Sequence, residues 1–138
     1  MKKLSTMLAM LSAMGASLPA HAAGPSAIEK RYTADYNRCM NSGDAANGVT
    51  SAMLDCTVAE YKRQDARLND AYRAAMARLS PARRSVLRTA QRRWLAERDP
   101  GCRRKAKPNE GGTIWGVVMT GCQTDETIKQ TMWIETYR

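Results

Sequence analysis

The chain has 138 residues, of which 22 are Lys or Arg and 13 are Asp or Glu, so its formal net charge is +9. A chain of this length predicts one domain with a modest hydrophobic core rather than several domains. Its single histidine, His21, argues against catalytic and metal sites that are built from several histidines.

The first 22 residues have the pattern of a secretory signal peptide. Met1-Lys2-Lys3 is a charged start, residues 4–18 form an apolar run, and Ala20-His21-Ala22 is the small-x-small pattern after which signal peptidase cleaves. The run is too short and too interrupted by Ser and Gly to predict a membrane span, and no later segment is apolar enough. We therefore expect an exported protein, periplasmic or secreted, whose domain is residues 23–138.

Cleavage would remove the histidine and leave 20 basic and 13 acidic residues, a net charge of +7. All four cysteines would remain. An even number of cysteines in an exported chain predicts two disulfides, for which three pairings are possible. The pairing of near neighbours in the sequence is the simplest of the three: Cys39 with Cys56, and Cys102 with Cys122.

The expected domain begins with small residues, 23–27, and a short first helix. Helical spacing of apolar residues runs from Ile28 to Met40. Asn41-Ser42-Gly43 predicts the end of this helix, followed by a polar loop as far as Gly48.

Two longer amphipathic helices follow, over residues 50–79 and 81–99, and Pro100-Gly101 predicts the end of the second. Ser80 is a natural N-cap and Pro81 suits the first position of a helix. Almost no loop separates the two helices, so we expect an antiparallel hairpin of neighbouring helices.

Residues 102–112 contain Pro, Gly and several basic side chains without apolar spacing, which predicts a loop. Thr113 is a suitable cap for a last helix, in which apolar spacing continues toward Tyr137. No segment alternates as a strand does. The predicted fold is all-α, a small disulfide-stapled bundle of about four helices with a central antiparallel helical hairpin.

Polar residues interrupt the apolar stripes of the two long helices. Asp65 lies on the stripe of the first helix, and Gln91 and Arg98 lie on that of the second. Proteins tolerate a buried charge only when it is paired and hydrogen-bonded. We predict a structural polar clamp in which Asp65 meets Arg98 between the helices, with Asn69 and Gln91 completing the network. The alternative is that these four residues form a binding site.

Four stretches have a specific order and spacing: Cys56-x3-Glu60-x4-Asp65-x2-Leu68-Asn69-x2-Tyr72, Leu87-x2-Ala90-Gln91-x2-Trp94-x3-Arg98-Asp99-x2-Cys102, Gly111-Gly112-Thr113 and Cys122-x4-Thr127. Over nearly the whole expected domain they resemble the LprI-like domain family of small exported bacterial proteins. That family is named for a lysozyme inhibitor, so the resemblance implies inhibition of a lysozyme. The family pattern usually has an Arg three residues after Thr127, where this chain has Gln130. Gln cannot make the bidentate contact that Arg makes.

The residues do not predict an enzyme. After cleavage the domain would have no histidine and no free thiol, and it has no Gly-x-Ser-x-Gly stretch or phosphate-binding loop. The usual nucleophile and base arrangements are therefore missing, and we expect no catalytic residues, metal or cofactor. Tyr72 and Trp94 could be ligand platforms, but their positions match the apolar faces, which favours the core.

Basic side chains gather at two places on the chain. Arg84, Arg88 and Arg92 repeat every four residues on one face of the third helix, where they repel one another. A solvated face and an anion-binding face are both consistent with this pattern. The predicted loop holds the second group, Arg103, Arg104, Lys105 and Lys107.

Two functions follow as hypotheses. The first is a lysozyme inhibitor whose basic loop, anchored by a disulfide, occludes the cleft that holds the two catalytic carboxylates. The alternative is an envelope-associated module that binds an anionic polymer or partner through the Arg-rich helix face. We expect no nucleic-acid partner, because the chain is predicted to be exported and shows no nucleic-acid-binding module.

Overall fold

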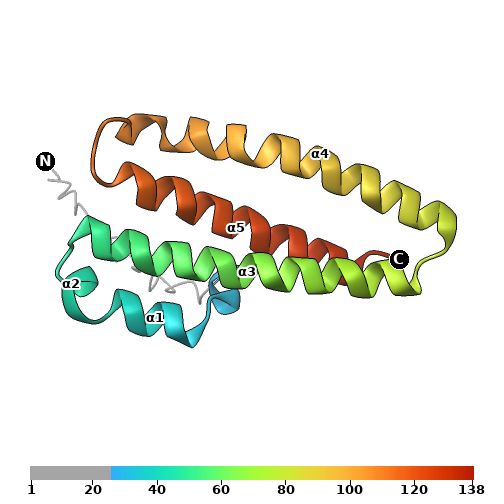
Figure 1. The fold of residues 1–138 in the computed structure, drawn as a ribbon, viewed down its shortest axis with the longest axis horizontal. Coiled ribbons are helices and arrows are strands. Elements are labelled where there is room, and N and C mark those ends of the chain that lie inside the picture. Colours follow the sequence, from blue (N-terminus) through green and yellow to red (C-terminus); the bar gives the residue numbers. More distant parts are fainter. Residues whose placement is uncertain (1–25) are drawn as a thin grey trace, which may run out of the picture.

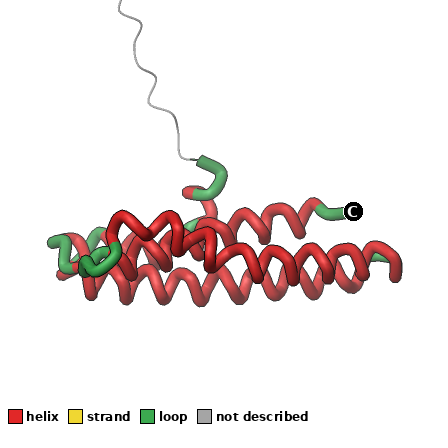
Figure 2. The backbone as a smooth tube through the Cα atoms, turned by 90° about the horizontal axis from the view of Figure 1, so that it is seen from above, coloured by secondary structure: helices red, strands yellow, loops and turns green. Residues whose placement is uncertain are grey.

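The computed structural model describes residues 26–138, so the predicted signal peptide, residues 1–22, lies outside the described residues. Within the described range every regular element is helical, as predicted (Figure 2). The elements in chain order are η1 (Glu29–Arg31), α1 (Ala34–Met40), α2 (Gly43–Ala46), α3 (Thr50–Arg78), α4 (Pro81–Ala106), η2 (Lys107–Asn109) and α5 (Trp115–Thr136). No helix among these residues is long and apolar enough to cross a membrane.

The three long helices lie side by side with their axes roughly aligned, and α5 lies between α3 and α4 (Figure 1). The short helices α1 and α2 lie along the first half of α3. The hairpin turn forms as expected, because Ser80 caps α4 by accepting a hydrogen bond of 3.4 Å from the backbone N–H of Arg83, and Pro81 is the first helical residue. However, α3 and α4 are not close neighbours along their backbones, since each packs mainly on α5.

The N-terminal helix and the third helix have bounds that differ from the prediction. The first breaks into η1 and α1 at Thr33, whose hydroxyl caps α1, and the polar loop after it contains α2. The third helix does not end at Pro100-Gly101 but continues to Ala106, so the predicted loop of residues 102–112 is wrong in its first half.

The continuation of α4 has a physical reason. Pro100 cannot donate the helical hydrogen bond to the carbonyl of Ala96, but residue 96 is exposed and its carbonyl can bond water. Beyond it, Cys102 and Ala106 are 1% and 0% exposed. The burial of these two residues against α5 outweighs the preference of proline to end a helix.

Two buried clusters make the core. One joins α3, α4 and α5 through Leu68, Ala75, Leu79, Leu87 and Ile134, and Tyr72 and Trp94 pack against it, as predicted for core aromatic residues. The other joins the end of α4 to the start of α5 through Cys102, Ala106, Met119 and Cys122.

Both disulfides follow the simplest predicted pairing. Cys39–Cys56 links α1 to α3, and Cys102–Cys122 links α4 to α5, with Cα–Cα distances of 5.7 and 5.5 Å. Cross-links that close loops of 17 and 20 residues restrict the unfolded chain. Each stabilises a small domain by about 2–4 kcal/mol.

We predict that Leu87→Ala will destabilise the domain strongly, because Leu87 is fully buried between the three long helices. The expected loss in the free energy of unfolding, measured by urea titration, is about 2–5 kcal/mol. Leu95→Ala is the matched control on the same helix. Its side chain is 49% exposed, so the expected change is below about 0.5 kcal/mol. Equal losses for both variants would contradict this packing of α4.

Candidate functional site

The residues of the predicted polar clamp do not meet as expected. Asn69 donates a hydrogen bond of 3.2 Å to Asp65 within α3, but the Nε of Arg98 pairs with Asp99 at 2.8 Å. The predicted Asp65–Arg98 pair is therefore wrong. From α3, Arg98 meets the ring of Tyr61 instead, at 5.4 Å from the ring centroid, and the ring of Trp94 on its own helix lies at 5.1 Å.

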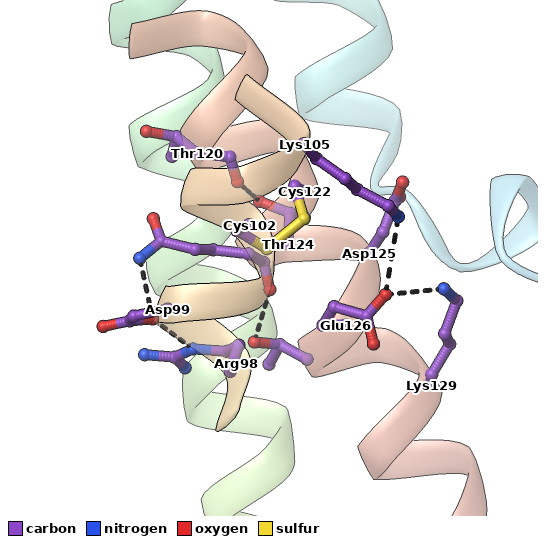
Figure 3. Close-up of a disulfide and its surroundings, with 12 residues drawn as sticks. Arg98, Asp99, Cys102, Lys105, Thr120, Cys122, Thr124, Asp125, Glu126 and Lys129 are labelled. Carbon is purple, nitrogen blue, oxygen red and sulfur yellow. Dashed lines mark hydrogen bonds and ion pairs between the residues drawn. A yellow bond between two sulfur atoms is a disulfide. The ribbon is translucent and has the colours of Figure 1, made fainter. Parts of the chain in front are cut away.

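Arg98 and Asp99 nevertheless form a charged pair that fastens α4 to its neighbours. Asp99 also accepts a hydrogen bond of 3.0 Å from Gln123 of α5 (Figure 3). The donors from Arg98 and then Gln123 hold the pKa of the Asp99 carboxyl below its usual value. Burial opposes the charged form of Arg98, whose side chain is 9% exposed, but Asp99 and Tyr61 keep its pKa above the usual value.

Gln91, the fourth member of the predicted clamp, bridges α4 and α5. Its Oε1 accepts a hydrogen bond of 2.9 Å from Gln130. Gln130, which stands where the family pattern usually has an Arg, therefore joins α5 to α4 through this amide pair. An amide pair here fills the space between two helices without adding a charge.

A buried carboxylate that the sequence reasoning missed organises the other side of α3. Glu60 is 0% exposed and accepts hydrogen bonds from the backbone N–H and the hydroxyl of Thr33, from Arg63 and from Gln64, at 2.5–3.0 Å. Burial alone would raise the pKa of this carboxyl, but the donors outweigh it and lower the pKa. Glu60 thus ties the N-terminus of α1 to α3.

Further polar contacts fasten the segment before α1. The backbone carbonyl of Arg31 accepts hydrogen bonds from Gln64 and Arg67 at 2.8 and 2.9 Å. The guanidinium of Arg31 donates two hydrogen bonds to the carboxylate of Glu135 on α5. The hydroxyl of Tyr32 donates to Asp125 at 2.8 Å. The side chain of Glu60 and its neighbours are therefore engaged in holding the fold, which leaves them few free hydrogen-bonding groups for a ligand.

A groove of about 540 Å³ lies beside this network, between α3 and α5. Its walls carry charges of both signs, so the groove has no preference for an anion or a cation. Residues 26–138 also contain no group of three or more His, Cys, Asp and Glu side chains placed to hold a metal ion. The residues that line the groove are Arg31, Gln64, Arg67, Asp70, Ala71, Ala74, Ile128, Thr131 and Glu135.

The positive charge of the domain is concentrated on α4. This helix contains nine basic and two acidic residues, a net charge of +7. The other described residues contain eleven of each sign and are neutral as a group. Only Leu87, Cys102 and Ala106 of α4 are buried, so most of its charged side chains face solvent. The strongest electrostatic feature of the molecule is therefore one outer helix.

The four basic residues of the predicted loop lie at the end of α4 and in η2, a group that we call the basic tip: Arg103, Arg104, Lys105 and Lys107. All four are exposed. Three of them line a hollow of about 360 Å³ together with Pro100; the exception is Lys105, whose Nζ lies 3.8 Å from Glu126 beside the Cys102–Cys122 disulfide (Figure 3). Lys107 pairs with Glu110, whereas Arg103 and Arg104 make no ion pair within residues 26–138.

In the second predicted basic group, Arg84, Arg88 and Arg92, the surroundings of Arg84 differ from those of the other two. Arg84 is half-buried and points a terminal nitrogen at the carbonyl of Ala77, 3.5 Å away at the end of α3. Arg84 therefore links the start of α4 to the end of α3 across the hairpin turn. Arg88 and Arg92 are exposed and have no ion pair or hydrogen bond with the described part of the chain.

We predict that Glu60→Gln will change how stability depends on pH. Because folding lowers the pKa of Glu60, its contribution to stability is complete above the unfolded pKa of about 4.3 and is lost as the pH falls through the folded pKa. The thermal midpoint of the wild type should therefore fall more steeply below about pH 4.5 than that of the variant. At neutral pH the variant should be less stable by about 1–3 kcal/mol.

Thermal unfolding followed by circular dichroism between about pH 3 and pH 7 measures both effects. Glu97→Gln, which removes a carboxylate that is 65% exposed, is the matched control and should leave the curve almost unchanged. Parallel curves for the wild type and Glu60→Gln would contradict the role of this carboxylate.

The comparisons with known proteins point to one family. The family model described as lysozyme inhibitor LprI matches residues 29–133, which run from η1 into α5 and include all four cysteines. An uncharacterized protein of Rhizobium meliloti (strain 1021) is 26% identical over 113 residues, covering 72% of this chain and 81% of the relative. No solved structure matches the chain significantly. From the extent of the family match, the chain belongs to the LprI lysozyme inhibitor family.

Proposed function

We propose that this protein is an exported inhibitor of a lysozyme, acting in the periplasm or outside the cell, and that its basic tip occludes the cleft of the enzyme. The observation that carries the proposal is the family match over residues 29–133. Two disulfides with no free cysteine among the described residues support export, because disulfides persist in oxidising compartments. The predicted signal peptide over residues 1–22 is consistent with it.

The chemistry of the target suits the tip. Lysozymes cleave glycan with two carboxyl groups that flank the scissile bond. A guanidinium pairs with a carboxylate through two parallel hydrogen bonds, which adds orientation as well as energy. Arg103 and Arg104 are exposed and have no ion pair within residues 26–138, and with Lys107 they surround the hollow beside Pro100. An acidic side chain of the enzyme entering this hollow would meet two guanidinium groups without an ion pair and the ammonium of Lys107, which pairs with Glu110.

The tip is held in place before it meets a partner. Cys102 is cross-linked to Cys122, and Ala106 is fully buried on α5, so the last turn of α4 is fixed on both sides of Arg103 and Arg104. A binding surface that is already ordered loses little conformational entropy on association. The helical form of this segment, in place of the expected loop, therefore favours tight binding.

The charge of α4 affects the rate of encounter. A lysozyme that is itself basic is repelled at long range, which slows association. Tight inhibition of such an enzyme then depends on slow dissociation, through contacts between the tip and carboxylates at close range. Screening by salt should accelerate this association.

The test is inhibition of cell-wall lysis by purified protein against animal lysozymes of several classes, with the variant Arg103→Gln/Arg104→Gln/Lys107→Gln. Each lost charge-assisted hydrogen bond contributes about 1.5–3 kcal/mol. The inhibition constant should therefore rise at least about tenfold. The matched control, Arg38→Gln/Arg73→Gln/Lys62→Gln, removes the same charge from exposed positions outside α4 and should inhibit as the wild type does.

Two results separate the function from the site. No inhibition by the wild type at large molar excess over every lysozyme tested would overturn the proposed function. Full inhibition by the tip variant would keep the function and overturn the role of the tip.

A further inference from the structure

We infer that α4 carries a second binding surface, which meets the basic tip at Arg103 and binds linear polyphosphate. The surface is the side of the helix that presents Arg88, Arg92 and Arg103, which we call the arginine stripe. The inference does not require lysozyme inhibition. It depends on how charge is distributed over the described residues.

The distribution of charge singles out this helix. Because the remainder of the described chain has equal numbers of acidic and basic residues, α4 holds the whole excess of +7. Stability alone does not require such an arrangement. Like charges four residues apart on a helix destabilise it by about 0.2–0.5 kcal/mol for each pair, and Arg88 and Arg92 are one such pair. A ligand of opposite charge would remove this repulsion.

The contacts within α4 separate its structural arginines from its free ones. Both of its acidic residues are already paired, Glu97 with Arg93 and Asp99 with Arg98. The carbonyl of Arg138 accepts from Arg83, and that of Ala77 accepts from Arg84. The remaining arginines are exposed and make no ion pair or hydrogen bond within residues 26–138: Arg88, Arg92, Arg103 and Arg104.

Three of these free arginines share one side of the helix. At about 100° per residue, Arg88, Arg92 and Arg103 lie within about 60° of one another, over about 22 Å of helix length. Arg104 projects about 160° away from Arg88 and is not part of the stripe. Leu87 and the Cys102–Cys122 disulfide anchor α4 on its inner side near both ends of the stripe, so the row of arginines is held in place on the fold.

The shape and chemistry of the stripe favour a linear polymer over a bilayer. The exposed large apolar side chains of α4 are Val86 and Leu95, 54% and 49% exposed. They lie about 180° apart around the helix, so α4 has no apolar face to insert among lipids. Phosphate groups suit guanidinium groups because they accept bidentate hydrogen bonds from them. A chain of phosphates could meet successive arginines along the row.

The experiment measures binding of linear inorganic polyphosphate to the full domain as a function of salt. The variant is Arg88→Gln/Arg92→Gln, which keeps the tip intact and retains residues of good helix propensity. The matched control is Arg38→Gln/Arg73→Gln, which removes the same charge from exposed positions outside α4. Circular dichroism checks that both variants keep the wild-type helix content.

We expect the stripe variant to bind polyphosphate at least about tenfold more weakly at low salt, with a salt dependence reduced by about two released counterions. The control should change by less than about twofold. Equal weakening in both variants would show that net charge alone attracts the polymer and would overturn the inference. Failure of the wild type to bind polyphosphate at low salt would overturn it too, as would tighter binding to single-stranded DNA of equal charge.

The same variants keep the two proposals distinguishable. If both hold, Arg88→Gln/Arg92→Gln loses polyphosphate binding and still inhibits lysozyme. Unchanged polyphosphate binding in this variant would overturn the stripe, whereas loss of inhibition would overturn the restriction of lysozyme binding to the tip.

Discussion

The central position of α5 is the constraint on which the rest of the structure depends. Its buried residues cover about 240° of the helix circumference, at 100° per residue. Three of them are threonines, and each hydroxyl donates to a carbonyl of the same helix, four residues earlier, at 2.7–2.8 Å. A threonine whose hydroxyl hydrogen bond is made within its own helix can be buried beside any neighbour without needing a polar partner there.

Small residues let α5 approach its neighbours closely. A Cβ at Gly116 would lie 3.1 Å from the side chain of Leu54 on α3, so glycine suits the contact at this point. With α5 filling the space between them, α3 and α4 have different surroundings. The side of α3 that carries Glu60 is covered by α1 and its polar network. In contrast, α4 packs on α5 and, through Leu87 and Arg98, touches side chains of α3, while its outer side is open to solvent.

This arrangement explains why the charge gathers on one helix. A charged group that is buried on α3 or α5 must be paired, as Glu60 is with Arg63. The outer side of α4 has no such requirement, and unpaired arginines remain in water. The disulfide at Cys102 then holds the far end of this helix, so the stripe and the tip are parts of one rigid surface that meet at Arg103. A polymer on the stripe would lie next to any enzyme held at the tip.

The sequence by itself determined the local features. Helical spacing, the Ser80-Pro81 start and the pairing of near cysteines each depend on residues that are close in the chain, and all three are found in the structure. The packing of Tyr72 and Trp94 against the core also followed from spacing alone. The family could be recognised from the same short-range order of residues.

Only the tertiary structure decided which faces meet. The spacing predicted a stripe on α3 that passes through Asp65 as well as Leu68. The buried side of α3 does contain Leu68, but before it runs through Cys56, Glu60 and Gln64, at intervals of four. Spacing reports that a helix has an apolar side, but not which helix will cover it or whether a carboxylate there will find donors. Glu60 found them in a segment 27 residues away, and α4 continued past Pro100 because α5 covered Cys102 and Ala106. Such contacts are decided by packing between distant segments, which the order of residues within one helix does not contain.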